Sequence, residues 1–206
     1  MQVMMSDTQI NGIVKYLKET DHMLEYGSGG STLMFSSFVK SYHSIEHHRE
    51  WFDKVSIKIN DADKYKNVSY HYIPPTYIGE DKGSLYAKEC LTKKDLKDIL
   101  QKFPLLEENN VYSSAGRYSQ FSKYIDHIDK LNQKKWDKIL IDGRARTSCA
   151  YKILPYIDKN SIVFIDDYYR QSYEGKTRGI VEFGNQLFNV YEPIDRIDTM
   201  LIIRKK

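Results

Sequence analysis

Cysteine is scarce in this chain of 206 residues, which contains only two. Cys90 and Cys149 lie far apart, and neither belongs to the Cys-x-x-Cys spacing that is typical of structural zinc sites. The sequence therefore argues against a zinc-binding module. Such sparing use of cysteine fits a reducing compartment, and we expect the protein in the cytoplasm, or in the host cytoplasm if its source is a virus.

Long apolar runs and dense basic clusters are also missing. No run of about 18 apolar residues occurs, and the first residues lack the apolar core of a signal peptide, so we expect no membrane span. The net charge is only +3, and the one compact basic cluster is Arg204-Lys205-Lys206. Surfaces that bind nucleic acid are usually denser in positive charge, so this class of partner is disfavoured.

What the sequence does contain is an alternation of short apolar strands with amphipathic helices. Strands are expected within 22–26, 41–46, 67–75, 136–144, 161–170, 179–184, 186–194 and 199–205. Helices are expected within 8–18, 31–40, 47–59, 92–103, 118–131 and 147–157. This alternation predicts a three-layer α/β/α sandwich of Rossmann-like type, with a mostly parallel sheet closed by two terminal strands. We expect one domain over 1–206, with a less regular insert at about 76–116.

Acidic side chains follow several of these predicted strands. Glu25, Glu46, Asp142 and the pair Asp166-Asp167 all stand at or just after a strand end. Ligands of open α/β sheets bind at the carboxyl ends of the strands. The coincidence predicts that these acids share one site.

A glycine-rich loop follows the first predicted strand, in the stretch MLEYGSGGST from Met23 to Thr32. No lysine follows Gly27 at the place where a phosphate-binding P-loop requires one. Thr32 occupies the third glycine position of the dinucleotide fingerprint, and the carboxylate of Glu25 would repel a pyrophosphate. A cationic ligand such as S-adenosylmethionine fits better, with Glu46 available to accept hydrogen bonds from both ribose hydroxyls. The plain alternative is an ordinary strand-to-helix turn with a solvated acid.

This loop, together with SIEHHREWFDKV after the second strand, resembles the first two motifs of class I S-adenosylmethionine-dependent methyltransferases. The resemblance extends from about Asp7 to Arg204 and is weakest at 76–112, where that family carries substrate-specific inserts. It implies a seven-stranded sheet with six parallel strands and one antiparallel strand. It also implies a set of cofactor-binding residues: Glu25, Gly27, Ser28, Gly29, Ser31, Thr32, Glu46, His47 and Asp142.

The acids after the fourth and fifth strands of the parallel series could serve the chemistry. Asp142, Asp166 and Asp167 could hold a divalent cation, Mg or Mn, which would lower the pKa of an acceptor hydroxyl. This arrangement resembles metal-dependent small-molecule O-methyltransferases, although their second acid is followed by Asn rather than Asp. Two alternatives stand beside it: Asp142 or Asp167 acts directly as a general base, or the pair caps a helix.

The segments DGRAR and DDYYR carry a second resemblance, to methyltransferase-like proteins of bacterial and large-virus glycan gene sets, including a domain of a chlorella-virus glycan-synthesis protein. It implies catalytic roles for Asp142, Arg144, Asp167 and Tyr168. Arg144 and Arg170 could bind substrate oxygens through forked hydrogen bonds, or they could form structural salt bridges. We expect Arg146 to face the following helix.

The sequence thus predicts methyl transfer from S-adenosylmethionine to a hydroxyl of a sugar, glycan or similar small polar acceptor. One alternative is a nucleic-acid methyltransferase, although YIPPTY at 72–77 lacks the Asp or Asn that precedes Pro-Pro in amino-methylating enzymes. A second alternative is a module that binds the cofactor or another nucleoside without catalysis. The oligomeric state is not predicted.

Overall fold

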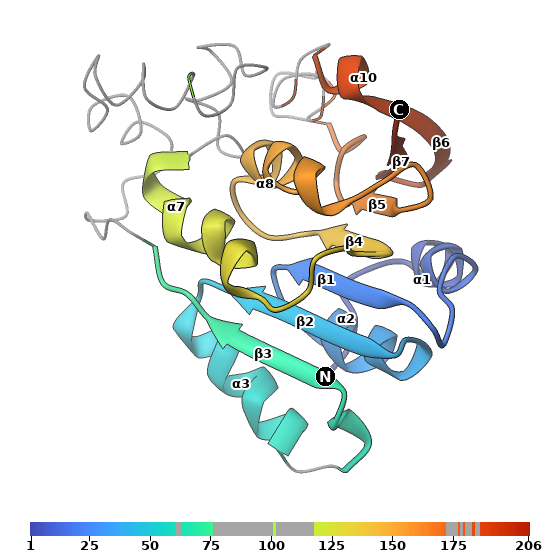
Figure 1. Cartoon of the computed structure of the whole chain (residues 1–206). Helices are drawn as coiled ribbons and strands as arrows, with labels where there is room; N and C mark the ends of the chain where they lie inside the picture. Colours follow the sequence, from blue (N-terminus) through green and yellow to red (C-terminus); the bar gives the residue numbers. More distant parts are fainter. Residues whose placement is uncertain are drawn as a thin grey trace.

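The computed structural model describes residues 1–60, 63–75, 101, 118–171, 177, 179, 183 and 186–206 (Figure 1). The expected helix at 92–103 and the expected strand at 179–184 fall almost wholly outside these residues. Seven strands are β1 (His22–Tyr26), β2 (Ser41–Glu46), β3 (Val68–Tyr72), β4 (Lys138–Ile141), β5 (Ile162–Ile165), β6 (Tyr191–Ile197) and β7 (Met200–Lys205). The α-helices are α1 (Asp7–Val14), α2 (Gly30–Phe35), α3 (Arg49–Asn60), α7 (Tyr118–Ile125), α8 (Arg146–Lys152) and α10 (Leu187–Val190).

The seven strands form one sheet in the order β3-β2-β1-β4-β5-β7-β6. The first five are parallel to one another, β7 runs antiparallel to β5, and β6 runs antiparallel to β7. The chain reverses at β1, so that β2 and β4 flank it on either side. Rossmann-like sheets bind ligands at such a reversal, at the carboxyl ends of the central strands.

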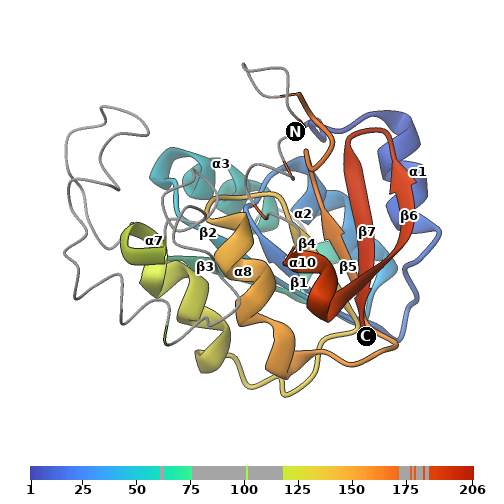
Figure 2. The same cartoon turned by 90° about the horizontal axis from the view of Figure 1, so that it is seen from above.

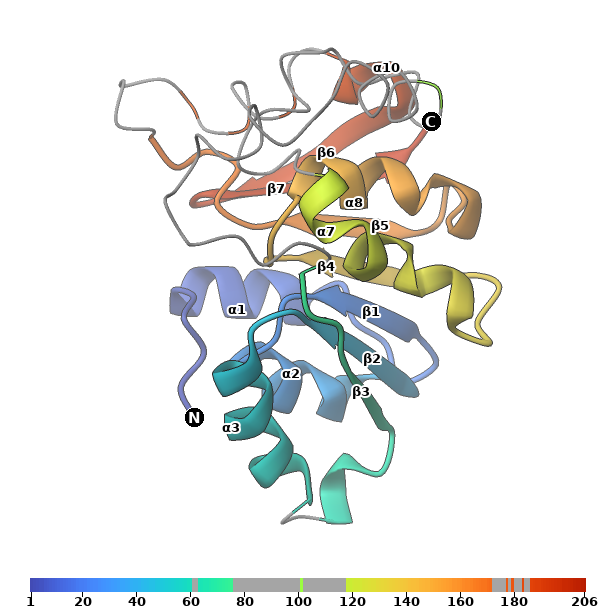
Figure 3. The same ribbon diagram turned by 90° about the vertical axis from the view of Figure 1, so that its left-hand side faces the viewer.

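Helices cover both faces of the sheet, which confirms the predicted three-layer α/β/α fold. Figure 2 shows α1, α2 and α3 on one face and α7, α8 and α10 on the other, and Figure 3 shows the same division from the side. Alternate strand residues supply the two cores: Leu24 and Ile139 face α7 and α8, whereas Met23 and Leu140 face α1 and α2. Within the described residues, no helix has both the length and the apolar character needed to cross a membrane.

Most element boundaries differ from expectation by a few residues; the helices expected within 31–40 and 147–157, for example, are α2 and α8, which end at Phe35 and Lys152. Two differences have a clear local cause. The strand expected from residue 186 begins only at Tyr191, because Leu187–Val190 form the helical turn α10, which buries Leu187 before the chain enters the sheet. The first helix begins at Asp7 because Ser6 caps it: the Ser6 hydroxyl accepts from the Gln9 amide, and the Gln9 side chain accepts from the Ser6 amide. It ends at Val14, four residues earlier than expected.

Candidate functional site

The predicted acids gather at the carboxyl edge of the four central parallel strands. Backbone hydrogen bonds set the strand ends side by side: the Gly27 amide donates to the Ile45 carbonyl at 2.9 Å, and the Asp142 amide donates to the Tyr26 carbonyl at 2.9 Å. On the far side of β4, the Asp166 amide donates to Ile141 at 3.1 Å. The ends of β2, β1, β4 and β5 therefore form one continuous row.

The amides of the glycine-rich loop point into the protein. The Ser28 amide donates to a Glu46 carboxylate oxygen at 2.8 Å, and the Gly29 amide donates to the Thr32 hydroxyl at 3.1 Å. The Gly27 amide is already bonded to Ile45. A loop that cradles a phosphate presents its amides to the anion. This loop presents none of these three, so its geometry disfavours a phosphate ligand.

Two glycines are required where the loops after β1 and β4 touch. Gly27 has φ +91°, and a Cβ there would lie 2.6 Å from the Gly143 amide nitrogen. A Cβ on Gly143 would lie 2.2 Å from the Tyr124 hydroxyl and 3.0 Å from the Gly27 nitrogen. Neither backbone can withdraw without breaking the row of strand ends. Gly27 is therefore required both for the turn after β1 and for the close contact between its backbone and that of Gly143.

Glu25 lies beneath the loop rather than at its surface. Its side chain is fully buried and accepts hydrogen bonds from three hydroxyls, those of Ser31 at 2.5 Å, Thr32 at 2.6 Å and Ser44 at 2.7 Å. Burial raises the pKa of Glu25 to about 7, even though these hydrogen bonds favour the ionised form. Glu25, Ser31 and Thr32 thus form a polar support that ties the loop to β1.

Glu46, at the end of β2, is almost fully buried, and both of its oxygens are engaged. One oxygen accepts from the amides of His47 and His48, and the other accepts from the amide and the hydroxyl of Ser28, all at 2.7–2.8 Å. Burial alone would raise the pKa of Glu46, but His47 and these donors outweigh it and lower the pKa. The carboxylate is therefore ionised at neutral pH and gives this end of the site a fixed negative charge.

Two aromatic residues outside the predicted set complete the surroundings of Ser28. The Trp51 indole N–H donates to the Ser28 carbonyl, and the Tyr70 hydroxyl lies 2.6 Å from the Ser28 hydroxyl. Trp51 comes from α3 and Tyr70 from the edge strand β3. Sequence reasoning singled out neither, because aromatic residues at these spacings serve equally well as core.

The loops after β4 and β5 are joined through one buried arginine, Arg146. Its guanidinium donates to the carbonyls of Gly143, Asp142 and Asp166, and lies 3.4 Å from an Asp142 carboxylate oxygen and 3.6 Å from an Asp167 one. The expectation that Arg146 faces the following helix is wrong. Arg146 is the first residue of α8, and side chains there point back toward the strand ends.

Asp142 and Asp166 form a carboxyl pair in this region. Burial raises the pKa of Asp142 well above its ordinary value, the charge of the neighbouring Asp166 carboxyl adds to the effect, and Arg146 opposes it. The side-chain Nε2 of Gln9, from α1, donates to a carboxylate oxygen of Asp166 at 3.0 Å.

The remaining predicted residues lie around this pair. Asp167, with φ +57°, lies 3.3 Å from the Arg170 guanidinium, so Arg170 forms the structural salt bridge that was one of its two expected roles. Arg144 is exposed. Tyr168 is only 3% exposed, and burial raises its pKa to about 12. Residues 166–169 form a turn, which gives the aspartate pair no helix to cap in this stretch.

The three aspartates do not fit a divalent-cation site in this arrangement. Asp142 lies 3.4 Å from the Arg146 guanidinium, and Asp167 lies 3.6 Å from Arg146 and 3.3 Å from Arg170, so cations of the protein already face two of the three carboxylates. Across the part of the chain that the structure describes, no group of three or more His, Cys, Asp or Glu side chains is arranged to hold a metal ion. We therefore assign no chemical step to a metal.

Comparison with known proteins reveals likeness in structure alone. No protein-family model matches the sequence, and no curated protein matches it. A methyltransferase-like protein from Silicibacter pomeroyi superposes with a TM-score of 0.64 at 16% identity, over 100% of this chain and 88% of its own. A candidate rRNA methylase from Clostridium thermocellum gives 0.55 at 11% identity, over 100% and 98%.

A candidate methyltransferase from Streptococcus mutans, solved in complex with SAH, gives a TM-score of 0.51 at 12% identity, over 99% of this chain and 100% of its own. These likenesses, together with the strand order, show that the chain has the α/β fold of methyltransferases. At such identities they show the fold alone. What the protein does has to be argued from the site.

Proposed function

We propose that the protein transfers the methyl group of S-adenosylmethionine to a hydroxyl of a sugar, a glycan or a similar small polar acceptor. One observation carries the proposal: the glycine-rich loop turns its first three amides inward, while ionised Glu46 closes the loop on one side. The site therefore favours a positively charged ligand over a phosphate. The S. mutans neighbour, solved with SAH on the same fold, supports this choice of donor.

S-adenosylmethionine would supply an activated methyl group at this edge of the sheet. The backbone at Gly27, Ser28 and Gly29 would approach it closely. Glu46 would accept a hydrogen bond from a ribose hydroxyl in place of the one that it receives from the Ser28 hydroxyl, with the neighbouring His47 beside it. Glu25, Ser31 and Thr32 would act from below, by holding the loop in place. Asp142, at the end of β4, would lie on the side of the acceptor.

Asp142 is the candidate general base. When a hydroxyl oxygen of the acceptor forms its new bond to the methyl carbon, the bond from that carbon to the sulfonium sulfur would break, with the neutral thioether as leaving group, and the hydroxyl proton must leave. A carboxylate with a raised pKa accepts that proton better than an ordinary one. Arg146, 3.4 Å from an Asp142 carboxylate oxygen, would stabilise the negative charge of that carboxylate. Exposed Arg144 stands at the same loop, where it could bind acceptor oxygens.

Titration calorimetry with S-adenosylmethionine, followed by transfer of a labelled methyl group to a panel of glycans, tests the proposal. Asp142→Asn should lower transfer by at least about 100-fold, the scale of general-base catalysis, with cofactor affinity changed little. Asp158→Asn, at the opposite end of β5, is the matched control and should change neither. Turnover that is unaffected by Asp142→Asn would refute the assignment of the base.

The same assay separates the two competing functions. Transfer to RNA or DNA instead of glycans, with affinity that falls steeply as salt rises, would point to a nucleic-acid methyltransferase. Binding of the cofactor with no transfer to any acceptor would point to a non-catalytic module. Failure to bind S-adenosylmethionine at all would overturn the proposed donor itself.

A further inference from the structure

The large exposed apolar residues of the described chain all belong to segments on one face of the sheet. Met4 is 85% exposed, Ile57 58%, Met1 46%, and Met34 and Phe38 38% each. They belong to the segment before α1, to α2 and the turn after it, and to α3, which all cover the same face of the sheet. An apolar surface of this kind marks an interaction site more often than a free surface.

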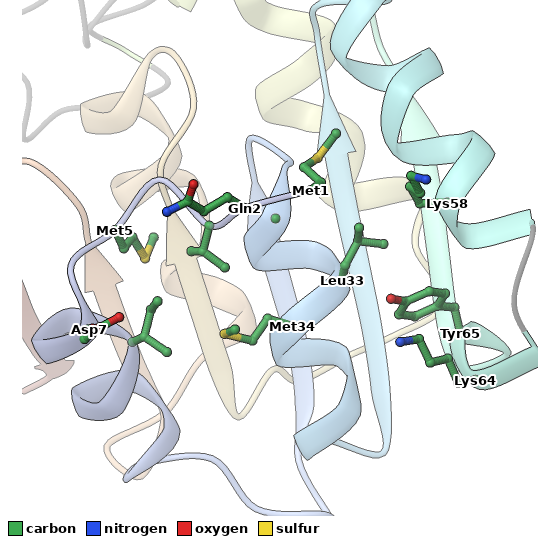
Figure 4. A pocket seen from close by; sticks show the side chains of 12 residues that line it. Met1, Gln2, Met5, Asp7, Leu33, Met34, Lys58, Lys64 and Tyr65 are labelled. Carbon is green, nitrogen blue, oxygen red and sulfur yellow. The ribbon is translucent and has the colours of Figure 1, made fainter.

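A groove of about 610 Å³ runs across this face, over the short helix α2 (Figure 4). Its lining includes six aliphatic side chains: Met1, Val3, Met5, Ile10, Leu33 and Met34. Methionine side chains are flexible and polarisable, so they adapt to an apolar partner surface better than branched side chains do. Gly30, which begins α2 at the end of the glycine-rich loop, also lines the groove.

The two ends of the groove carry opposite charges. Lys58 and Lys64, from α3 and the turn after it, stand at one end, and Asp7, at the start of α1, stands at the other (Figure 4). Asp198 adds a second acid near Asp7, because its carboxylate accepts a hydrogen bond from the adjoining Ser6 hydroxyl. All four charged side chains are exposed.

From this pattern we infer that the face binds a second copy of the same chain. A two-fold axis through the apolar centre would set the basic end of one copy against the acidic end of the other, twice over, which is the self-complementarity that a symmetric dimer requires. Met4, the most exposed apolar side chain of the set, stands on the segment that borders the groove and supplies a projecting group that can enter the groove of the partner.

Sedimentation velocity over a concentration series, from about 1 to 200 μM, tests this inference. The expected result is a reversible shift from the 24.3 kDa chain to a species of twice that mass. Met4→Asp and Lys64→Glu should each weaken the dimer by at least about tenfold. The first buries a charge at the contact, and the second sets an acid against the acidic end of the other copy. Both positions are exposed, so folding should be unaffected, which circular dichroism checks.

A charge exchange makes the test specific to this geometry. Asp7→Lys alone should weaken the dimer as Lys64→Glu does. The variant that carries both substitutions should recover most of the lost affinity, because the lysine at position 7 of one copy then faces the glutamate at position 64 of the other. Lys159→Glu, on the exposed turn before β5, is the matched control and should leave the dimer unchanged. A single 24.3 kDa species at every concentration would overturn the inference, and so would a dimer that is indifferent to Met4→Asp and to both single charge reversals.

Discussion

Replacement of Gly27 by alanine tests how tightly the loops after β1 and β4 depend on each other. The backbone of Gly27, at φ +91°, costs an ordinary residue about 1–2 kcal/mol. The added methyl would stand 2.6 Å from the Gly143 nitrogen and 2.7 Å from its Cα, and forced overpacking of this kind costs about 1–3 kcal/mol more. We therefore expect Gly27→Ala to lower the free energy of unfolding by about 2–5 kcal/mol.

Urea denaturation measures this loss directly, and for a chain of this size it corresponds to a fall in Tm of about 4–20 °C. Gly29→Ala is the matched control in the same loop: its φ of 167° is extended, and its Cβ would come no nearer than 3.3 Å, to the Trp51 indole nitrogen. We expect the control to cost less than about 1 kcal/mol. An equal loss of unfolding free energy at Gly27 and Gly29 would refute the argument that the close backbone contact with Gly143 requires glycine at position 27.

Three further predictions concern the site and its surroundings. Arg146→Met removes the cation between two buried loops and should cost about 3–5 kcal/mol in urea denaturation; a loss below about 1 kcal/mol would contradict its role. Ser28→Ala frees one hydrogen-bonding position on Glu46 for a ribose hydroxyl and should tighten S-adenosylmethionine binding by about 2–10-fold in calorimetry, while weaker binding would show that the hydroxyl is needed. Burial lowers the pKa of both His43 and His127 from 6.5 to about 4, so the unfolded chain binds more protons between these values. Stability should therefore be full above pH 6.5 and should fall as the pH drops toward 4, and His43→Gln should flatten the pH dependence of Tm.

The fold could be predicted from the sequence because its strands are short apolar runs between helices with a clear apolar face. The start of β6 could not. The segment from 186 to 190 is as apolar as a strand, and only the burial of Leu187 against the rest of the core decides that it forms a helical turn. Local propensity is a weak guide where tertiary packing decides.

The acids of the candidate site could also be predicted, because parallel strands end at a common edge and each acid follows a strand. Their partners could not. Arg146 joins the loop after β4 to the loop after β5. Trp51 contacts Ser28 from the helix α3 and Tyr70 contacts it from the strand β3, and only the fold shows that these elements lie beside the loop. Whether Glu25 lies above or beneath the loop depends on the direction of three hydroxyls, which no spacing in the sequence encodes.

The inward hydrogen bonds of the glycine-rich loop also bear on the entropic cost of binding a ligand. Because Gly27, Ser28 and Gly29 are already fixed by Ile45, Glu46 and Thr32, the loop has little conformational freedom left to lose. A ligand that enters here meets a preorganised surface and bears a small entropic cost of ordering. The amides of these three residues should accordingly exchange with deuterium slowly before any ligand is added, and a bound cofactor should slow them little further.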